Sequence, residues 1–149
     1  MTDVLAPVAG AVHALADVPD PVFAGEIVGS GVAVEPSADG PEVVVSPLDG
    51  TLVKLHPHAF VVVSAEGTGV LVHLGIDTVQ LAGEGFELLA TEGGPVAAGA
   101  PVIRWDPAEV VRGGRSAVVP VVLMDSTPGS VVAPTVGSTV AVGDLLFSP

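Results

Sequence analysis

The sequence predicts an all-β fold, a flattened antiparallel β-sandwich or barrel with duplicated strand motifs and one or two very short helices. The first observation is a series of short valine-rich runs, at residues 43–45, 61–63, 118–123 and 131–132. The second is that glycine, proline, serine and aspartate separate these runs, and such residues favour tight turns. Helical periodicity is scarce, so we expect strands to make up most of the regular structure.

Two segments are each echoed later in the chain, which indicates the duplication. APVAGAV at residues 6–12 is echoed by SPLDGTL at 46–52. GPVAAGAPVI at 94–103 is echoed by VGSTVAVGDLL at 136–146. Each echo is typical of one strand–turn–strand unit used twice, so we expect a sandwich with related halves.

Helix signals occur in two places. Asp106 is suited to cap a helix, Pro107 to its first position and Gly113 to its end. Residues 20–28 are expected to hold about one further helical turn. We expect the longest surface loop at residues 126–137.

Length, charge and the absence of cysteine limit the classes of function. A chain of 149 residues suits one domain, residues 1–149, which buries about 70% of its unfolded surface. With no cysteine, disulfides and thiol chemistry on this chain are excluded. The formal net charge of −13 argues against nucleic acids and anionic membranes, and it favours encounter with a basic protein surface.

The chain carries no sequence signal for a membrane or for export. No apolar run reaches the length of about 18 residues that a membrane-spanning helix needs. The N-terminus, MTDVLAPVAG, lacks a basic segment followed by a long apolar one. We therefore expect a cytoplasmic, free-standing protein without membrane insertion.

One histidine, His73, stands in the most informative segment, VLVHLGIDTVQLAGEGF. Alternation over residues 70–76 predicts a strand with one wholly apolar face, which we expect to be buried. That face carries Val70, Val72, Leu74 and Ile76. His73 then lies on the opposite face beside Leu71. Small Gly75 leaves room above the ring, and a carboxylate lies further along at Asp77. An imidazole displayed in this way is suited to contact with another molecule.

A second histidine, His58, lies upstream in HPHAF. The pattern predicts a strand over residues 58–64 and a turn at 66–69, after which the strand of His73 begins. An antiparallel hairpin closed by that turn would bring His58 and His73 near each other.

These residues resemble a known family. VHLGIDTV, preceded by HAF at residues 58–60, is similar to the glucose-type Enzyme IIA (EIIA) phosphocarriers of the bacterial phosphoenolpyruvate:sugar phosphotransferase system. Further matches extend the resemblance from Val4 to Phe147: APVAG, DVPDPVFAGEIVGSGVAVEP, SPLDGTL and PVAAGAPVIRWD. Of these, the VHLGIDTV motif is the specific one.

The resemblance implies a phosphotransferase component that transfers a phosphoryl group between proteins. Such a carrier takes the group from a histidine of the general carrier HPr, holds it on His73 and passes it to a cysteine of a sugar-specific IIB domain. His58 is implied as the group that stabilises the phosphoryl. No cofactor or metal is required, although the family's histidine pair binds zinc weakly when a partner adds a carboxylate. Regulatory protein partners also occur in the family.

Phosphoryl transfer between histidines depends mainly on positioning and charge stabilisation. The nucleophile is a neutral imidazole with one bare nitrogen, so we predict that Nε2 of His73 attacks. Its Nδ1–H then donates to a backbone carbonyl, and Gly75 is our candidate. The incoming group carries about two negative charges, and His58 is the candidate donor to one of its oxygens.

Four further residues are assigned from the resemblance. Asp20 and Asp77 are placed around the histidine pair, and Phe23 and Leu71 in the partner-docking surface. A carboxylate beside a phosphohistidine repels the phosphate, so Asp77 is not assigned as a base. We expect Asp77 either to face a basic residue of a partner or to fix a turn.

The chain departs from the family two residues before His58. Family members usually carry a hydroxyl residue there, often threonine, whose side chain helps to orient the first histidine. Here that position holds His56, followed by Pro57. Either His56 or a backbone group is then left to orient His58.

The alternative is a zinc hydrolase. His73 and Asp77 have an H-x-G-x-D spacing, and His56 and His58 form H-x-H, as in lysostaphin-type peptidases. Three imidazoles and a carboxylate would suffice for zinc. The two motifs, however, come in the reverse of the order usual in those enzymes.

Overall fold

The computed structural model describes residues 3–149. The strands found there are β1 (Val4–Leu5), β2 (Gly10–Ala14), β3 (Gly29–Glu35), β4 (Glu42–Val45), β5 (Gly50–His56), β6 (Ala59–Val63), β7 (Gly69–His73), β8 (Phe86–Leu88), β9 (Pro95–Val96), β10 (Pro101–Trp105), β11 (Val119–Met124), β12 (Thr139–Val140) and β13 (Leu145–Phe147). The helices found there are η1 (Leu15–Asp17), α1 (Pro21–Ala24), η2 (Thr78–Leu81) and α2 (Pro107–Arg112), where η denotes 3₁₀ geometry.

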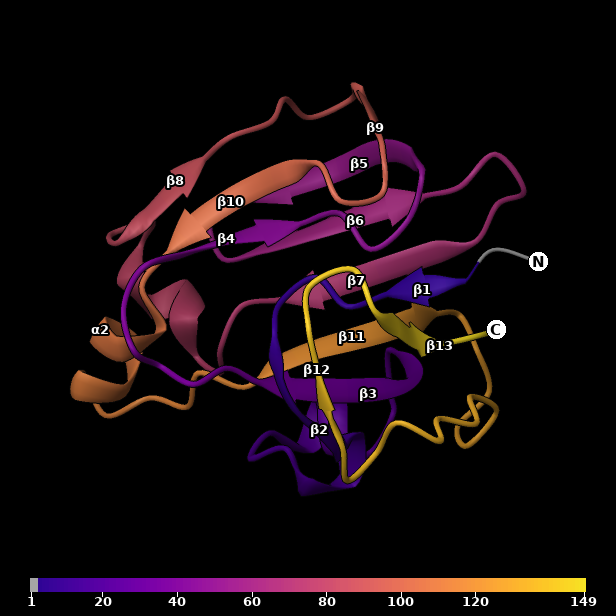
Figure 1. Cartoon of the computed structure of the whole chain (residues 1–149), viewed down its shortest axis with the longest axis horizontal. Helices are drawn as coiled ribbons and strands as arrows, with labels where there is room; N and C mark the ends of the chain where they lie inside the picture. Colours follow the sequence, from indigo (N-terminus) through magenta and orange to yellow (C-terminus); the bar gives the residue numbers. More distant parts are fainter. Residues whose placement is uncertain (1–2) are drawn as a thin grey trace.

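All strand pairs within the described residues are antiparallel, and they form three sheets. The largest sheet has eight strands in the order β12-β2-β3-β11-β7-β6-β5-β9, and it curls into a half-barrel (Figure 1). A three-stranded sheet, β4-β10-β8, and a two-stranded pair, β1-β13, complete the fold. This architecture confirms the predicted fold class, including its very short helices.

The main core packs the three-stranded sheet against the eight-stranded one. Ile103 and Trp105 of β10 belong to the same buried cluster as Phe60 of β6 and Val72 of β7. A second, smaller cluster lies around α1 and η1, and it consists of Leu15, Val18, Phe23, Ala33, Ile76, Val118 and Val122. Phe23 of α1 and Ile76, which follows β7, both belong to this second cluster, so their packing holds α1 beside the end of β7.

Both sequence echoes correspond to repeated local structure. A short turn joins β9 to β10, and another joins β12 to β13. The glycines that open β2 and β5 share a packing constraint. A Cβ built on Gly10 would lie 2.0 Å from the carbonyl oxygen of Glu35, and one on Gly50 would lie 2.3 Å from that of Val63. Each glycine therefore allows its strand to cross close to a neighbouring backbone.

The predicted helices and the long loop are also present. Asp106 caps α2 by accepting a hydrogen bond from the Ala108 N–H at 2.9 Å, and Gly113 ends the helix. Helix α1 lies within the predicted region 20–28. The chain between β11 and β12 contains the expected loop, so the valine run at 131–132 forms no strand.

The histidine hairpin is shorter than the alternation predicts. Strand β7 ends at His73, and the prediction of a strand to residue 76 was wrong. The backbone turns at Gly75, with φ of 79°, and at Asp77, with φ of 61°. Leu74 and Ile76 are nevertheless buried, as their alternation predicts.

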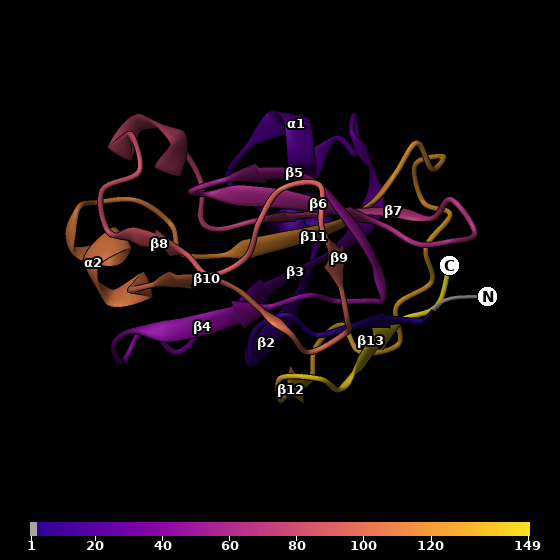
Figure 2. The ribbon, with the colours of Figure 1, turned by 90° about the horizontal axis from the view of Figure 1, so that it is seen from above.

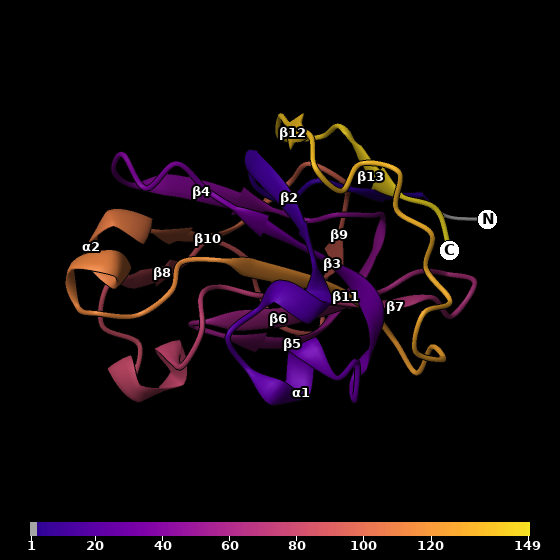
Figure 3. The same ribbon diagram turned by 90° about the horizontal axis from the view of Figure 1, so that it is seen from below.

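Helices α1 and η2 lie on the same face of the molecule, whereas α2 lies at one end (Figures 2 and 3). Figures 2 and 3 show α1 on the face opposite β12, with the mauve η2 segment on the α1 side. Among the described residues, no helix is long and apolar enough to cross a membrane.

Candidate functional site: a histidine pair beside helix α1

The hairpin brings the two predicted histidines together. His58 immediately precedes β6 and His73 ends β7, and the strand register pairs Ala59 with His73. The Leu74 N–H donates to the His58 carbonyl oxygen at 2.7 Å, which ties the two chain segments together beyond the strands. The ring centroids of His58 and His73 lie 5.1 Å apart, with the rings nearly perpendicular at 78°. The predicted proximity of the pair is confirmed.

One ring nitrogen of His73 is engaged by the backbone. Its Nδ1 lies 2.6 Å from the carbonyl oxygen of Gly75. A carbonyl oxygen only accepts hydrogen bonds, so Nδ1 carries the proton and the neutral ring leaves Nε2 bare. This confirms the predicted contact with Gly75. The arrangement leaves Nε2 available as a nucleophile.

The surroundings of His73 keep it partly buried. The Phe23 ring of α1 lies 5.1 Å from the imidazole at a tilt of 58°. Burial lowers the pKa of His73 below its usual 6.5, while the Gly75 hydrogen bond and the charges of Asp20 and Asp77 act in the opposite direction with smaller effect. A lowered pKa keeps this imidazole neutral at pH 7, which nucleophilic attack requires.

His58 is also held in its neutral form. Burial is the largest cause that lowers its pKa below 6.5, and the neighbouring rings of His73 and His56 lower it further. The His56 ring stacks on that of His58 with centroids 5.9 Å apart and planes at 25°. Within residues 3–149, the His58 ring has these ring contacts and no hydrogen bond. The Leu74 N–H holds the His58 backbone, and the ring itself contacts the rings of both His56 and His73.

These pKa shifts predict how stability depends on pH. In the unfolded chain both histidines titrate near 6.5, whereas in the folded protein they titrate lower. As the pH falls through 6.5, the unfolded chain takes up protons first. The free energy of unfolding should therefore be fully retained above this pH and decline below it, until the folded histidines protonate as well. Urea unfolding at a series of pH values measures this decline.

An NMR titration of the imidazole protons checks the same prediction residue by residue. Midpoints for His58 and His73 below 6.5 are expected. In the variant His73→Gln, the part of the decline in the free energy of unfolding below pH 6.5 that arises from His73 should disappear. A His73 midpoint at or above 6.5 would contradict the prediction.

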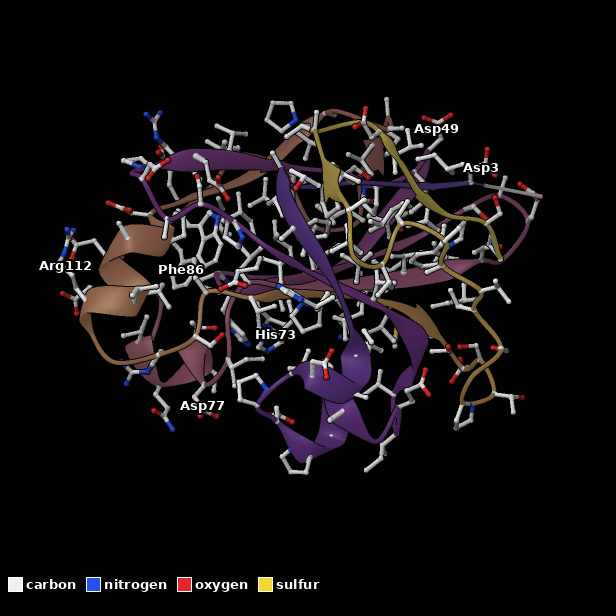
Figure 4. The ribbon with its side chains drawn as sticks, turned by 60° about the horizontal axis from the view of Figure 1, so that its bottom comes forward. Asp3, Asp49, His73, Asp77, Phe86 and Arg112 are labelled. Carbon is white, nitrogen blue, oxygen red and sulfur yellow. The ribbon has the colours of Figure 1, made fainter. Side chains whose placement is uncertain are left out.

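The other predicted site residues differ in how close they lie to the pair. Asp20 caps α1, and its Oδ1 accepts hydrogen bonds from Val22 N–H at 2.9 Å and Phe23 N–H at 3.4 Å. Phe23 is only 8% exposed, so most of its ring is packed inside the protein. Leu71 lies partly buried on β7, on the same face as His73. Figure 4 shows His73 between the strands and α1, whereas Asp77 lies further out beside η2.

Two residues that were not predicted from the sequence, Thr78 and Ser116, hold the Gly75 turn. Thr78 is fully buried, and its hydroxyl donates to the Leu74 carbonyl oxygen at 2.6 Å. The Ile76 N–H donates to the Ser116 carbonyl oxygen at 3.0 Å. A side chain at Gly75 would have no space, because a Cβ there would lie 2.7 Å from Thr78 Cγ2 and 2.9 Å from the Ser116 oxygen.

A signal for Thr78 was present in the sequence, while none existed for Ser116. Thr78 directly follows Asp77 at the point where the apolar alternation ends, a position where a hydroxyl commonly bonds to a nearby backbone group. Ser116 approaches from a segment far along the chain, and it contributes through its backbone, which any residue could supply.

The described residues contain no group of three or more histidine, aspartate or glutamate side chains placed to hold a metal ion. The three imidazoles and the carboxylate of the zinc-hydrolase alternative are therefore not assembled as a metal site. A cavity of about 360 Å³ lies between α2 and the segment 81–86, and neither histidine of the pair lines it. The histidine pair lies outside this cavity.

Comparison with known proteins identifies the same family that the sequence resembles. A family model described as phosphoenolpyruvate-dependent sugar phosphotransferase system, EIIA 1, matches residues 2–129. The glucose-specific EIIA component of Bacillus anthracis is 39% identical over 142 residues, which cover 94% of this chain and 84% of that protein. The N-acetylglucosamine-specific EIICBA component of Escherichia coli K12 is 43% identical over 124 residues, 82% of this chain and 19% of that protein.

A solved structure has the same fold. The glucose permease IIA from Mycoplasma capricolum superposes with a TM-score of 0.84 at 32% identity, and the match covers 97% of this chain and 93% of that one. Neither the family model nor these relatives support a zinc hydrolase. The chain belongs to the glucose-type EIIA family, the phosphoryl carriers of the bacterial phosphoenolpyruvate-dependent sugar phosphotransferase system.

Proposed function

We propose that His73 is the phosphorylated residue of this carrier, that phospho-HPr is its donor and that a sugar-specific IIB domain is its acceptor. The observation that carries the proposal is the contact between His73 Nδ1 and the Gly75 carbonyl oxygen at 2.6 Å, with the His58 ring alongside. We further propose that residues 1–149 act as a single domain and that the reaction takes place in the cytoplasm. A relative whose name joins C, B and A components supports a IIB-type partner.

The chemistry requires two transfers at one nitrogen. In the first, Nε2 of His73 attacks the phosphorus of phospho-HPr, a new N–P bond forms, and the N–P bond to the HPr histidine breaks. In the second, a thiolate of the IIB cysteine attacks, an S–P bond forms, and Nε2 is released bare. Neither step changes an oxidation state. Throughout, the proton stays on Nδ1 of His73, because the Gly75 carbonyl oxygen accepts a hydrogen bond from that N–H.

His58 is placed to stabilise the transferred charge. Its ring is neutral and adjacent to His73, and one of its nitrogens carries a proton that it donates to a phosphoryl oxygen. The arriving dianion also raises the tendency of His58 to take up a second proton, which strengthens that hydrogen bond. No metal is needed for either step.

The partner surface is proposed to surround the pair. Leu71 lies on the face of His73, and the Phe23 ring lies against the imidazole. Asp20 and Asp77 act at longer range on His73, and we propose that their charge faces a basic partner residue. The net charge of −13 favours encounter with such a partner, at rates that fall with increasing salt.

Reconstitution tests the function directly. The protein is incubated with phosphoenolpyruvate, Enzyme I and HPr, and its intact mass is measured before and after mild acid. A gain of one phosphate that acid removes is expected, followed by loss of the phosphate when a IIB domain is added. An unchanged mass would refute the proposed function.

A further prediction concerns His58, and His56 provides its matched control. His58→Phe keeps an aromatic ring beside His73 but removes both ring nitrogens. We expect phosphoryl transfer through His73 to slow by about a hundredfold, the usual cost of losing one donor to a developing charge. His56→Phe keeps the stack on His58 and should change the rate by less than about threefold. Rapid-quench transfer rates from phospho-HPr measure both variants, and equal effects would contradict the role of His58.

A further inference from the structure

We propose that Thr78 is a positioning residue for phosphoryl transfer: its buried hydroxyl closes the turn whose Gly75 carbonyl keeps His73 in the attacking tautomer. The inference rests on the proposed function of His73, and it adds a residue that touches neither the phosphoryl group nor a partner. Thr78 is fully buried, so any effect on the reaction must act through the turn.

The turn between β7 and η2 is held at its two ends. The Thr78 hydroxyl donates to the Leu74 carbonyl oxygen at 2.6 Å, which joins the residue after His73 to the first residue of η2. The N–H of the same Leu74 donates to the His58 carbonyl oxygen at 2.7 Å. Leu74 thus links Thr78 to the backbone of His58, and the Gly75 carbonyl is carried on the next peptide.

The hydroxyl, rather than the bulk of Thr78, is the part that fixes the carbonyl. The Thr78 methyl and the Ser116 carbonyl oxygen both lie close to the position that a Cβ on Gly75 would take, so packing also restricts the turn. Packing alone does not set the rotation of a peptide plane as a hydrogen bond does. Without the hydroxyl, the buried Leu74 carbonyl loses its partner and gains by rotating toward another donor.

A loose Gly75 carbonyl would change which nitrogen of His73 carries the proton. The tautomer of a neutral histidine is set by the hydrogen bond that its other nitrogen makes. When the acceptor at Nδ1 is displaced, the proton is free to occupy Nε2, and that nitrogen no longer attacks phosphorus. The fraction of protein able to react falls as the population of the Nε2–H tautomer of His73 rises.

Two variants separate the hydroxyl from the shape of the side chain. Thr78→Val keeps the branched shape and loses the hydroxyl, whereas Thr78→Ser keeps the hydroxyl. Thr135→Val is the matched control, because the Thr135 hydroxyl also donates to a backbone carbonyl, that of Leu146 at 2.8 Å, in the loop before β12. Each variant is examined by ¹⁵N NMR of the His73 ring at pH 8, by thermal unfolding, and by the rate of transfer from phospho-HPr.

We expect Thr78→Val to shift His73 toward the Nε2–H tautomer and to slow phosphorylation about three- to tenfold, the effect of one lost hydrogen bond. Thr78→Ser should retain the wild-type tautomer and rate, and Thr135→Val should lose stability without altering either. A wild-type tautomer in Thr78→Val, or a shifted one in Thr78→Ser, would overturn the proposal. Should Thr78→Val not fold, the comparison of Thr78→Ala with Thr78→Ser isolates the same hydroxyl.

The ring spectrum needs no phosphoryl donor, so it tests Thr78 even when the proposed function fails. In that case wild-type protein would remain unphosphorylated, while the tautomer would still respond to the hydroxyl. Conversely, a phosphorylated wild type together with an unresponsive tautomer would remove Thr78 from the account and leave His73 in place.

Discussion

Replacing His73 with glutamine should abolish acid-labile phosphorylation, with a loss of at least about a thousandfold in the rate of transfer from phospho-HPr. Glutamine has no nitrogen lone pair that attacks phosphorus, whereas the bare Nε2 of His73 provides one. The fold should survive, because His73 ends β7, keeps some solvent exposure and is replaced by a polar side chain of similar length. Labelling with radioactive phosphoenolpyruvate in the presence of Enzyme I and HPr measures the loss.

His13→Gln is the matched control for this experiment. His13 lies on β2, its Nε2 pairs with Glu35 at 2.8 Å, and it has no contact with the pair. Its replacement should leave labelling unchanged. Full labelling of His73→Gln, or equal loss in the two variants, would show that another residue carries the phosphate.

Gly75→Ala should produce the largest loss of stability among single substitutions at the site, about 2–4 kcal/mol. One part of this cost is the backbone, since φ of 79° is unfavourable for alanine by about 1 kcal/mol. The larger part is steric, because the new Cβ would lie 2.7 Å from Thr78 Cγ2 and 2.9 Å from a backbone oxygen of Ser116. Relief of these clashes would also displace the carbonyl that binds His73.

Gly67→Ala separates these two costs. Gly67 has φ of 91°, and a Cβ there would meet nothing within 4 Å. Its replacement should cost only about 1 kcal/mol, and it should leave phosphorylation unaffected. Chemical unfolding and transfer rates give the comparison. Equal stability losses in the two variants would mean that the close packing at Gly75 contributes nothing.

The sequence predicts the fold class and the pairing of the histidines because local signals determine both. Alternation over 70–76 identifies the buried face correctly, and the turn at 66–69 sets the hairpin that brings His58 beside His73. The cap at Asp106 and the end at Gly113 are equally local, and α2 begins and ends as they predict. Each of these features depends on residues that are close together in the chain.

Contacts between distant segments explain what the sequence did not predict. The strand of His73 ends earlier than its alternation implies, because Ser116 pairs with Ile76 and the backbone turns at Gly75. Leu74 and Ile76 remain buried within the turn, so the apolar alternation continues past the end of β7. Periodicity alone therefore does not reveal where the strand ends. Phe23 also reaches His73 from a separate element, and its extent of burial depends on how α1 packs.

The central claim is that Nε2 of His73 carries the phosphoryl group. The most direct measurement is a ¹⁵N–³¹P NMR experiment on ¹⁵N-histidine protein that has been phosphorylated through HPr. We predict one phosphorus signal coupled to Nε2 of His73, with Nδ1 still protonated and bonded to the Gly75 carbonyl. A phosphorus signal coupled to Nδ1 of His73, or to either nitrogen of His58, would contradict the account.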